Sequence, residues 1–344
     1  MNLSVIAKVK SGNRSRRRRW TLVTLALAIG VAALAVAHLI FGRTIYPLSD
    51  VIRVIYGENI QGASFAVGTL RIPRMLAGLF AGFAFGAAGS VFQTMLGNPL
   101  ASPDIIGVSS GASAAAVFCI LVLRLSGALV SLTAVTAGIL TAALIYLLSR
   151  SGEFAGGRLI LIGIGVGTML NAVVSYLLLR ASQYDIPAAF RWLSGSLNGT
   201  RLIDLPPLII AVAVFFPPLL YLGRSLRALE LGDNTALALG VSVNRVRLIL
   251  IVCAVALVAF PTSVTGPIAF VAFLSGPIAL RMAGTARTAA LPAGFVGAAL
   301  VLAADLIGQF AFDTKFPVGV ITGIIGAPYL IFLLIRINLS GGHS

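Results

Sequence analysis

The chain carries few side chains that could do covalent or metal chemistry, and their spacing assembles no catalytic set. Its 344 residues include only two histidines, His38 and His343, and two cysteines, Cys119 and Cys253. A histidine metal site or a nucleophile triad needs several such groups together. The cysteines stand alone in apolar stretches, which favours buried packing roles. We therefore predict no catalytic residue, no metal site, no bound cofactor and no enzyme activity.

Groups for phosphate and proton chemistry are equally sparse. None of the three lysines follows a glycine, so the chain has no GxxxxGK[ST] loop with which to bind ATP. A carrier driven by protons or sodium ions needs acids within its membrane spans. Only Asp305 qualifies, and a single acid near a helix end is more typical of a packing or capping group. The sequence thus indicates an energy source in another chain and leaves an ion-coupled secondary carrier as a remote alternative.

The elements that must position these residues are membrane helices. Hydrophobic residues make up 58% of the chain and charged residues 10%, which excludes an ordinary water-soluble enzyme. A span needs about 20 apolar residues. We predict an all-α polytopic integral membrane protein with about ten transmembrane helices. The predicted spans are 20–42, 66–95, 105–123, 127–148, 159–179, 206–222, 248–265, 266–283, 289–307 and 324–337.

The net charge of +15 is concentrated before the first span, where seven Lys and Arg residues lie. Such a basic segment is typical of a cytosolic N-terminus beside membrane lipid, so we expect no nucleic-acid partner. Ten spans then place the C-terminus in the cytosol too. We predict a basic cytosolic tail at 1–19, a single transmembrane domain at 20–337 and a cytosolic C-terminal tail at 338–344.

Glycine and proline patterns indicate close packing and broken helices. Gly78, Gly82 and Gly86 recur at four-residue spacing, followed by Gly89, and such a stripe lets a second helix approach closely. Helix-breaking segments such as Gly97-Asn98-Pro99 and Gly266-Pro267 occur in both halves of the chain. Irregular backbone at membrane depth needs protein or a water-filled cavity around it, which favours a transport pathway.

Several ordered motifs resemble the FecCD family of ABC importer permeases. They are Arg71-Ile-Pro-Arg74, Asn98-Pro-Leu-Ala-Ser-Pro-Asp104, Leu239-Gly-Val-Ser242, Gly266-Pro-Ile-Ala-Phe270, Phe316-Pro-Val-Gly-Val320 and Gly326-Ala-Pro328. The resemblance covers residues 45–337. It implies a BtuC-like fold with an inverted repeat, in a bacterial cytoplasmic (inner) membrane. It also implies import of a ferric siderophore, haem or vitamin B12.

Within that family, four segments look most like the ferric-enterobactin permeases. They are 162–166, 194–199, 240–243 and 284–287. The resemblance implies a catecholate, enterobactin-like ferric siderophore as cargo, with a hydroxamate siderophore, haem or vitamin B12 as alternatives. Many relatives carry an arginine four residues after Asp305, where this chain has Gln309, as does the enterobactin-type branch. Ser275–Ile278 also departs from a Pro-His pair that is frequent in the family.

The resemblance assigns Arg71, Arg74 and Gln309 to docking of an extracytoplasmic siderophore-binding lipoprotein. Paired charges at an exposed interface steer encounter and set its register, and the two arginines are predicted at the outer surface. Anchoring to phospholipid headgroups is the alternative.

The resemblance also assigns the cytosolic loop 224–247 to coupling with the ATPase. We predict two short helices, Ser225–Leu231 and Thr235–Leu239. Gly232 can end the first, Asp233 or Asn234 can cap the second, and Gly240 can end it. A solvated connector is the alternative. The coupling residues are Glu230, Gly232, Asp233, Leu239, Gly240 and Val241.

The implied complex contains a dimer of ABC ATPase subunits, which use ATP and Mg, and a second permease, either a copy of this chain or a sister chain. The turn 149–153 corresponds to the cytosolic exit gate of the family, so Ser149 and Ser151 are weak gate candidates.

Overall fold

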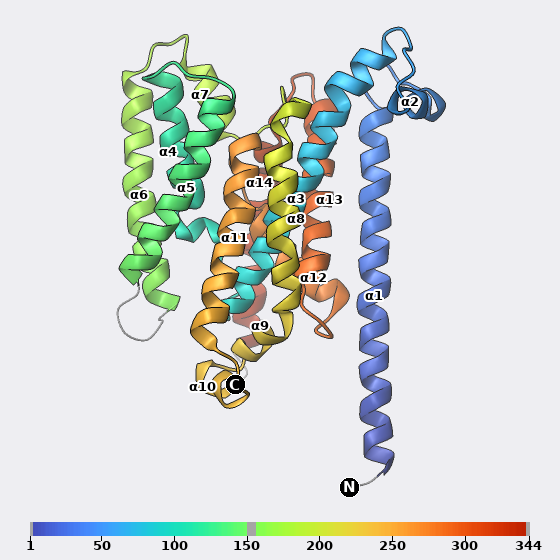
Figure 1. Ribbon diagram of the computed structural model, residues 1–344, viewed down its shortest axis with the longest axis vertical. Coiled ribbons are helices and arrows are strands. Elements are labelled where there is room, and N and C mark those ends of the chain that lie inside the picture. Colours follow the sequence, from blue (N-terminus) through green and yellow to red (C-terminus); the bar gives the residue numbers. More distant parts are fainter. Residues whose placement is uncertain (1–2, 150–155, 342–344) are drawn as a thin grey trace.

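The computed structural model describes residues 3–149 and 156–341, and the regular structure within these ranges is entirely helical (Figure 1). The helices are α1 (Leu3–Ile40), α2 (Leu48–Ile55), the π-helical η1 (Ser64–Arg71), α3 (Ile72–Met95), the 3-10 turn η2 (Pro103–Ile106), α4 (Val108–Leu121), α5 (Ala128–Ser149), α6 (Gly156–Arg180), α7 (Ile186–Leu193), the 3-10 turn η3 (Leu202–Asp204), α8 (Pro206–Tyr221), α9 (Gly223–Leu229), α10 (Asp233–Ala238), α11 (Val243–Thr265), α12 (Val271–Ala283), α13 (Ala290–Phe310) and α14 (Val318–Gly341).

The prediction of an all-α polytopic protein with about ten spans is confirmed. Seven helical stretches in the described ranges are long and apolar enough to cross a membrane. Three shorter apolar helices, α4, α12 and α14, account for the remaining predicted spans. Together the ten follow the predicted order along the chain.

Three predicted starts of later spans are wrong. The seventh span was expected from residue 248, but α11 begins at Val243. The eighth span was expected from residue 266, but α12 begins at Val271, because Gly266 has φ +70° and its Cα lies against the Trp192 carbonyl. The backbone then turns again at Phe270, with φ +64°. The tenth span was expected from residue 324, but α14 begins at Val318, directly after Pro317.

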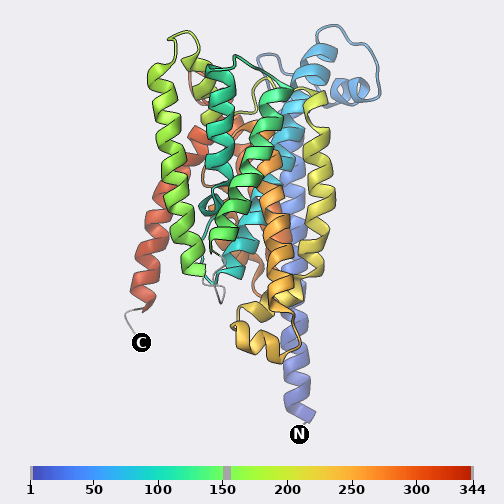
Figure 2. The same cartoon turned by 60° about the vertical axis from the view of Figure 1, so that its left-hand side comes forward.

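Helix α1 crosses the predicted boundary between tail and span without a break. Its residues run as one helix from Leu3 to Ile40. Arginine is a good helix former, so the basic segment simply continues the helix of the span. Figure 2 shows this segment extending beyond the other helices.

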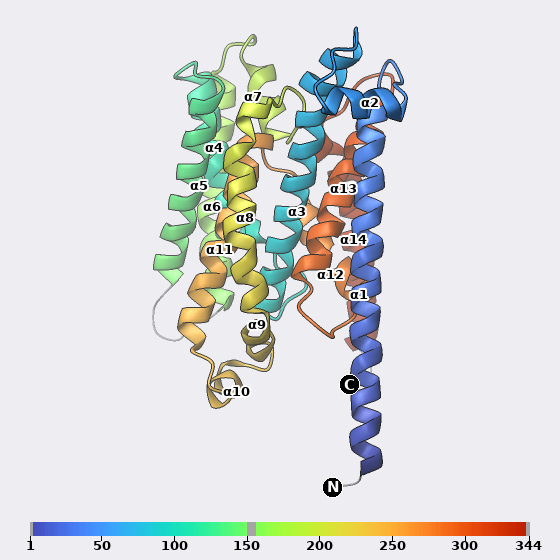
Figure 3. The same ribbon diagram turned by 45° about the vertical axis from the view of Figure 1, so that its right-hand side comes forward.

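Helices α3 and α13 form the tightest packing in the molecule, side by side in Figure 3. A side chain at Gly82 would collide with the Gly297 backbone, and one at Gly86 with the Ala293 carbonyl. The predicted glycine stripe is thus a contact of backbone against backbone. Gly89 continues it against Ala272 of α12.

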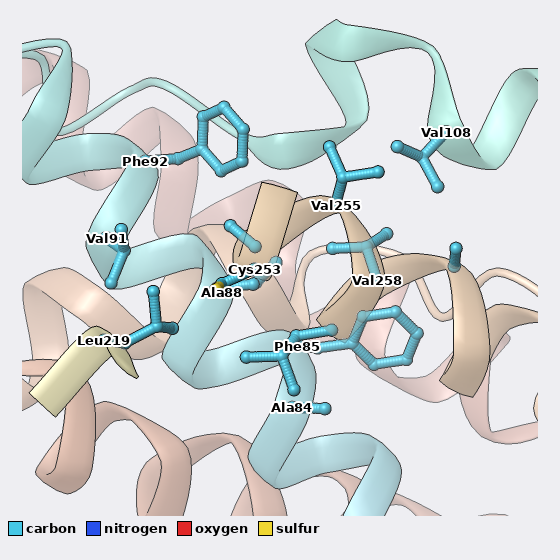
Figure 4. Close-up of a cluster of buried hydrophobic side chains, with 14 of the residues drawn as sticks. Ala84, Phe85, Ala88, Val91, Phe92, Val108, Leu219, Cys253, Val255 and Val258 are labelled. Atoms are coloured by element: carbon cyan, nitrogen blue, oxygen red, sulfur yellow. The ribbon is translucent and has the colours of Figure 1, made fainter. Parts of the chain in front are cut away.

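The main core joins α3 to α8 and α11. Figure 4 shows Phe85 and Phe92 of α3 beside Val255 and Val258 of α11, with Leu219 of α8 at the left. Cys253 lies in the same cluster and Cys119 in a smaller one, so the prediction that both cysteines are buried is confirmed.

Helices α4, α5 and α6 form a second group, joined to the core through α11 (Figure 1). Gly163 of α6 lies against the Ile105 carbonyl. The rest of α6 is open, since only 17% of its most apolar window is buried inside the molecule. This surface requires lipid or a second protein to cover it.

The short helices mark two ends of the bundle. Helices α2 and α7 lie at one end, which we call the α2/α7 end. Helices α9 and α10, the N-terminal part of α1 and the C-terminal part of α14 lie towards the opposite end, the α9/α10 end (Figures 1 and 2). The arginines of the predicted docking site and the predicted coupling loop therefore lie at opposite ends.

Candidate functional site

At the α2/α7 end, Arg74 of α3 forms a two-pronged ion pair with Asp305 of α13. Arg74 Nε and Nη2 each donate to a carboxylate oxygen at 2.8 Å. Gln309 Nε2, one turn further along α13, donates to Asp305 Oδ2 at 2.8 Å. The Asp305 side chain is only 1% exposed, so its charge is neutralised by these buried donors.

His38 brings α1 to the same carboxylate. Its Nε2 lies 3.0 Å from the Leu302 carbonyl and its Nδ1 lies 3.8 Å from Asp305 Oδ2. Three helices, α1, α3 and α13, therefore meet at one acid. The sequence singled out both Asp305 and His38, yet did not bring them together, because 267 positions separate their numbers and no pattern links them.

The Arg71 side chain caps the C-terminus of α1. It donates from Nη1 to the carbonyls of Leu39 and Ile40, at 2.8 and 2.9 Å, and from Nη2 to the Thr44 carbonyl at 2.7 Å. Its guanidinium also lies over the Tyr46 ring, 5.1 Å from the centroid. A cation at these terminal carbonyls satisfies acceptors that the helix itself cannot.

The predicted docking residues Arg71, Arg74 and Gln309 surround one cavity of about 380 Å³ at the α2/α7 end. Both arginines also hold the fold together, a role that sequence reasoning missed. The exposed cations of the same cavity are Arg43, Arg201 and Lys315. Arg201 is paired with Asp204 at 3.0 Å, and this hydrogen bond raises the pKa of the arginine. Arg43 and Lys315 are the other two exposed cations of the cavity.

At the α9/α10 end, the predicted coupling loop forms two short helices joined by Gly232. Both begin two residues earlier than predicted, α9 at Gly223 and α10 at Asp233. Gly232 has φ +92°, which favours glycine there. The expectation that Asp233 or Asn234 caps α10 is wrong, because Gly232 occupies the cap position and no side chain bonds there. The Asp233 carboxylate instead accepts from Arg247 of α11, at 2.7 and 3.1 Å.

Gly240 ends α10 as predicted. It has φ +79°, its N–H donates to the Leu237 carbonyl at 2.9 Å, and the N–H of Val241 donates to the Ala236 carbonyl at 3.0 Å. This pair of bonds is a Schellman motif. The motif fixes the direction in which the chain leaves the helix and enters α11.

The surface of this knob, α9 and α10 with residues 230–232 and 239–242, carries three exposed leucines among polar residues. Leu231, Leu237 and Leu239 are each more than half exposed. Glu230 lies beside them, and burial raises its pKa although the nearby Arg227 opposes the shift. Arg227 Nη1 donates to the Ala286 carbonyl at 2.8 Å, tying α9 to the loop between α12 and α13.

Of the two gate candidates, only Ser149 lies in the described residues. Ser149 is buried at the end of α5, and its hydroxyl donates to the Tyr146 carbonyl at 2.8 Å. Ser151 lies outside the described residues. Within the described ranges, no three His, Cys, Asp or Glu side chains gather where they could hold a metal ion.

Comparisons with known proteins agree on one family. A sequence profile of the FecCD transport family matches residues 21–336. The ferric enterobactin transport system permease protein FepG of Escherichia coli (strain K12) is 38% identical over 320 residues, covering 93% of this chain and 97% of FepG. The achromobactin transport system permease protein CbrC of Dickeya dadantii (strain 3937) is 35% identical over 335 residues, covering 95% of each chain.

The fold has a solved counterpart. A metal-chelate type ABC transporter in an inward-facing conformation superposes with a TM-score of 0.82 at 26% identity, over 92% of this chain and 99% of the other. The helical order and the two ends described above are therefore those of an importer's membrane subunit.

Proposed function

The chain belongs to the FecCD transport family of ABC importer permeases, and we propose that its cargo is a ferric siderophore of the catecholate type. The observation that carries the proposal is the match to FepG along almost the whole of both chains. CbrC, which is named for achromobactin, is nearly as similar. The alternative cargoes are those implied by the family resemblance: hydroxamate siderophores, haem and vitamin B12.

The knob at the α9/α10 end is proposed as the contact with a separate ATPase dimer, which binds ATP and Mg. Three exposed leucines, Leu231, Leu237 and Leu239, offer an apolar surface, and Gly240 fixes its shape through the Schellman motif. The ion pair between Asp233 and Arg247 links the knob to α11, which passes through the core. Movement of the knob would thus be transmitted to the transmembrane helices.

The cavity at the α2/α7 end is proposed as the docking site of an extracytoplasmic siderophore-binding lipoprotein. Five cationic side chains surround it: Arg43, Arg71, Arg74, Arg201 and Lys315. Acidic side chains of a binding protein complement such a surface. Gln309 also lines the cavity and donates to Asp305, the carboxylate that holds Arg74.

A second permease, either a copy of this chain or a sister chain, is proposed to cover the open helices of the α4 to α6 group. Helix α6 is the most open of the long spans, and Gly165 on it has no atom within 4 Å of where a side chain would begin. A weakly binding path between two such surfaces suits a large hydrophilic chelate.

We propose the bacterial cytoplasmic (inner) membrane as the location, with the α9/α10 end and both termini in the cytosol. The support is the cluster of basic residues at the N-terminal part of α1, which lies at that end. Basic residues beside a span are retained on the cytosolic side.

Reconstitution tests the cargo. The chain is placed in liposomes with its ATPase, its partner permease and the binding protein. ATP hydrolysis and iron uptake are then measured with a ferric catecholate, a ferric hydroxamate, haem or vitamin B12. We expect the ferric catecholate to stimulate both activities most strongly. Stronger stimulation by one of the other three would assign the chain that cargo and contradict the catecholate proposal.

A further inference from the structure

The arginines in the N-terminal part of α1 form a ring around the helix, which we call the collar. Arg14, Arg16, Arg17, Arg18 and Arg19 are all exposed. At about 100° per residue, their directions leave no gap wider than about 100° around the helix axis. A helix that docks against one protein surface needs charge on one face only. Arg19 contacts α12, but the ring of charge extends beyond that one contact, and charge directed to the other sides suits lipid headgroups.

The collar lies directly before the apolar part of the span. The apolar run begins at Trp20, and the helix continues through Ile40 without interruption. Clusters of Lys and Arg at this position lie at headgroup depth and attract anionic phospholipids.

The last arginine of the collar is attached to the end of α12, and the next residue, Trp20, is attached to the loop between α12 and α13. Arg19 donates from Nε to the Met282 carbonyl at 3.0 Å and from Nη2 to the Arg281 carbonyl at 2.8 Å. Trp20 Nε1 donates to the Thr288 carbonyl at 3.2 Å. Arg287 covers the Trp20 ring, with its guanidinium carbon 5.2 Å from the centroid.

The same loop supports α9 from its other side. Arg227 of α9 donates to the Ala286 carbonyl, two positions from the Trp20 contact. The residues of the loop, α9, α12 and the end of α3 enclose a cavity of about 420 Å³, with Arg227 and Arg287 in its wall. The loop and α9 are thus joined by the Arg227 hydrogen bond beside a cavity, and this space is not filled by packed side chains.

We propose that the arginine collar binds anionic phospholipid headgroups, and that this binding holds the end of α12 and the loop after it, residues 281–288, in the position that supports α9. The permease would then couple ATP hydrolysis to transport only when anionic lipid surrounds α1. The coupling half of this inference rests on the proposed function, whereas the lipid-binding half does not.

Lipid binding is tested on the purified chain in neutral detergent. The midpoint of thermal unfolding is measured with added phosphatidylglycerol or phosphatidylcholine. We expect stabilisation by phosphatidylglycerol in the wild type and its loss in the variant R14Q/R16Q/R17Q/R18Q. The variant R14K/R16K/R17K/R18K should retain it. A control that removes four exposed arginines at the α2/α7 end, R43Q/R124Q/R180Q/R191Q, should also retain it.

Retention of the stabilisation in the glutamine variant would overturn the lipid site. Equal stabilisation by a short oligonucleotide, competing with the lipid, would overturn the choice of lipid and indicate a general polyanion site.

Coupling is tested on the full transporter in vesicles of phosphatidylcholine with or without phosphatidylglycerol. The measured quantity is cargo imported per ATP hydrolysed. We expect this ratio to rise with phosphatidylglycerol in the wild type. Trp20→Phe keeps an aromatic ring and the whole collar but removes the donor to Thr288, so it should bind lipid normally and lose the rise.

An unchanged lipid response in Trp20→Phe would overturn the link through the loop. A transporter that moves no iron chelate in any vesicle would contradict the proposed function, while the unfolding measurements would still decide the lipid site.

Discussion

Arg74 and Asp305 form a buried ion pair across 231 positions of sequence, with two hydrogen bonds of 2.8 Å. The pair joins the helices α3 and α13 at the α2/α7 end, and Gln309 and His38 hold the carboxylate from two further directions. An arginine identified from its motif as a docking residue is therefore also a structural residue. A substitution at Arg74 changes both roles at once.

We expect Asp305→Asn to destabilise the protein by roughly 3 kcal/mol. Removing one partner of a buried ion pair costs about 3–5 kcal/mol. We take the lower value because the Arg74 side chain is 15% exposed. Thermal unfolding in detergent measures it. Glu58→Gln is the matched control, since the Arg53–Glu58 pair is more than half exposed on both sides and should contribute at most about 1 kcal/mol. Equal midpoints for the two variants would contradict the structural role.

Docking of the binding protein is better tested at Arg43 and Lys315 than at Arg71 and Arg74. The first two line the same cavity without supporting a helix end or the Asp305 carboxylate. We expect R43E/K315E to slow association of the binding protein about tenfold at low salt, with the difference shrinking as salt is added.

Surface plasmon resonance on the detergent-solubilised permease gives these rates. Arg191→Glu is the control, because Arg191 is exposed on α7 at the same end but does not line the cavity. Association of R43E/K315E at the wild-type rate would place the docking surface elsewhere.

We expect Gly240→Val to uncouple ATP hydrolysis from transport. The residue has φ +79°, where a side chain adds strain of about 1–2 kcal/mol, so the Schellman motif opens and the knob changes shape. The ratio of cargo moved to ATP hydrolysed is the measurement. Gly57→Val introduces similar strain at φ +91° at the opposite end, with open space around it, and should leave the ratio unchanged. A normal ratio in Gly240→Val would count against the knob.

We expect Gly86→Ala to destabilise the protein by about 1–3 kcal/mol. Its new methyl group would collide with the Ala293 carbonyl, and a contact between two backbones cannot adjust by rotating a side chain. Gly30→Ala in α1 is the control, because nothing lies within 4 Å of its added carbon and alanine favours a helix. The two midpoints of unfolding should therefore move in opposite directions, and a common direction would contradict the packing argument.

Local patterns in the sequence predicted most of the fold. The apolar runs located ten helices, the four-residue spacing of Gly82 and Gly86 predicted a close helix contact, and Gly240 predicted the end of α10. Each of these features depends on residues that are near one another in the chain. The helix starts at Val271 and Val318 were missed because they depend on backbone contacts and turns made beyond the apolar run.

The site was predicted only in its parts. The motif located Arg71 and Arg74, but the partners of both arginines lie on other helices, at Asp305 and at the end of α1. Likewise, the basic segment that includes Arg19 was interpreted from charge alone, although the carbonyl partners of Arg19 and Trp20 lie more than 260 positions away. Periodicity carries no information about such pairs, because burial of a polar group determines its partner only once the helices are packed.

The contact between α3 and α13 also affects biosynthesis. Met95 and Ala290 are about 200 residues apart, so at roughly 5–20 residues per second the ribosome needs roughly 10–40 s to supply α13 after α3 is complete. During that interval the glycine stripe of α3 faces lipid or the insertion machinery, and Arg74 has no Asp305 with which to pair. Nascent chains stalled before residue 290 should therefore be held by the membrane insertion apparatus, and full protection from proteases should arise only when Asp305 has emerged.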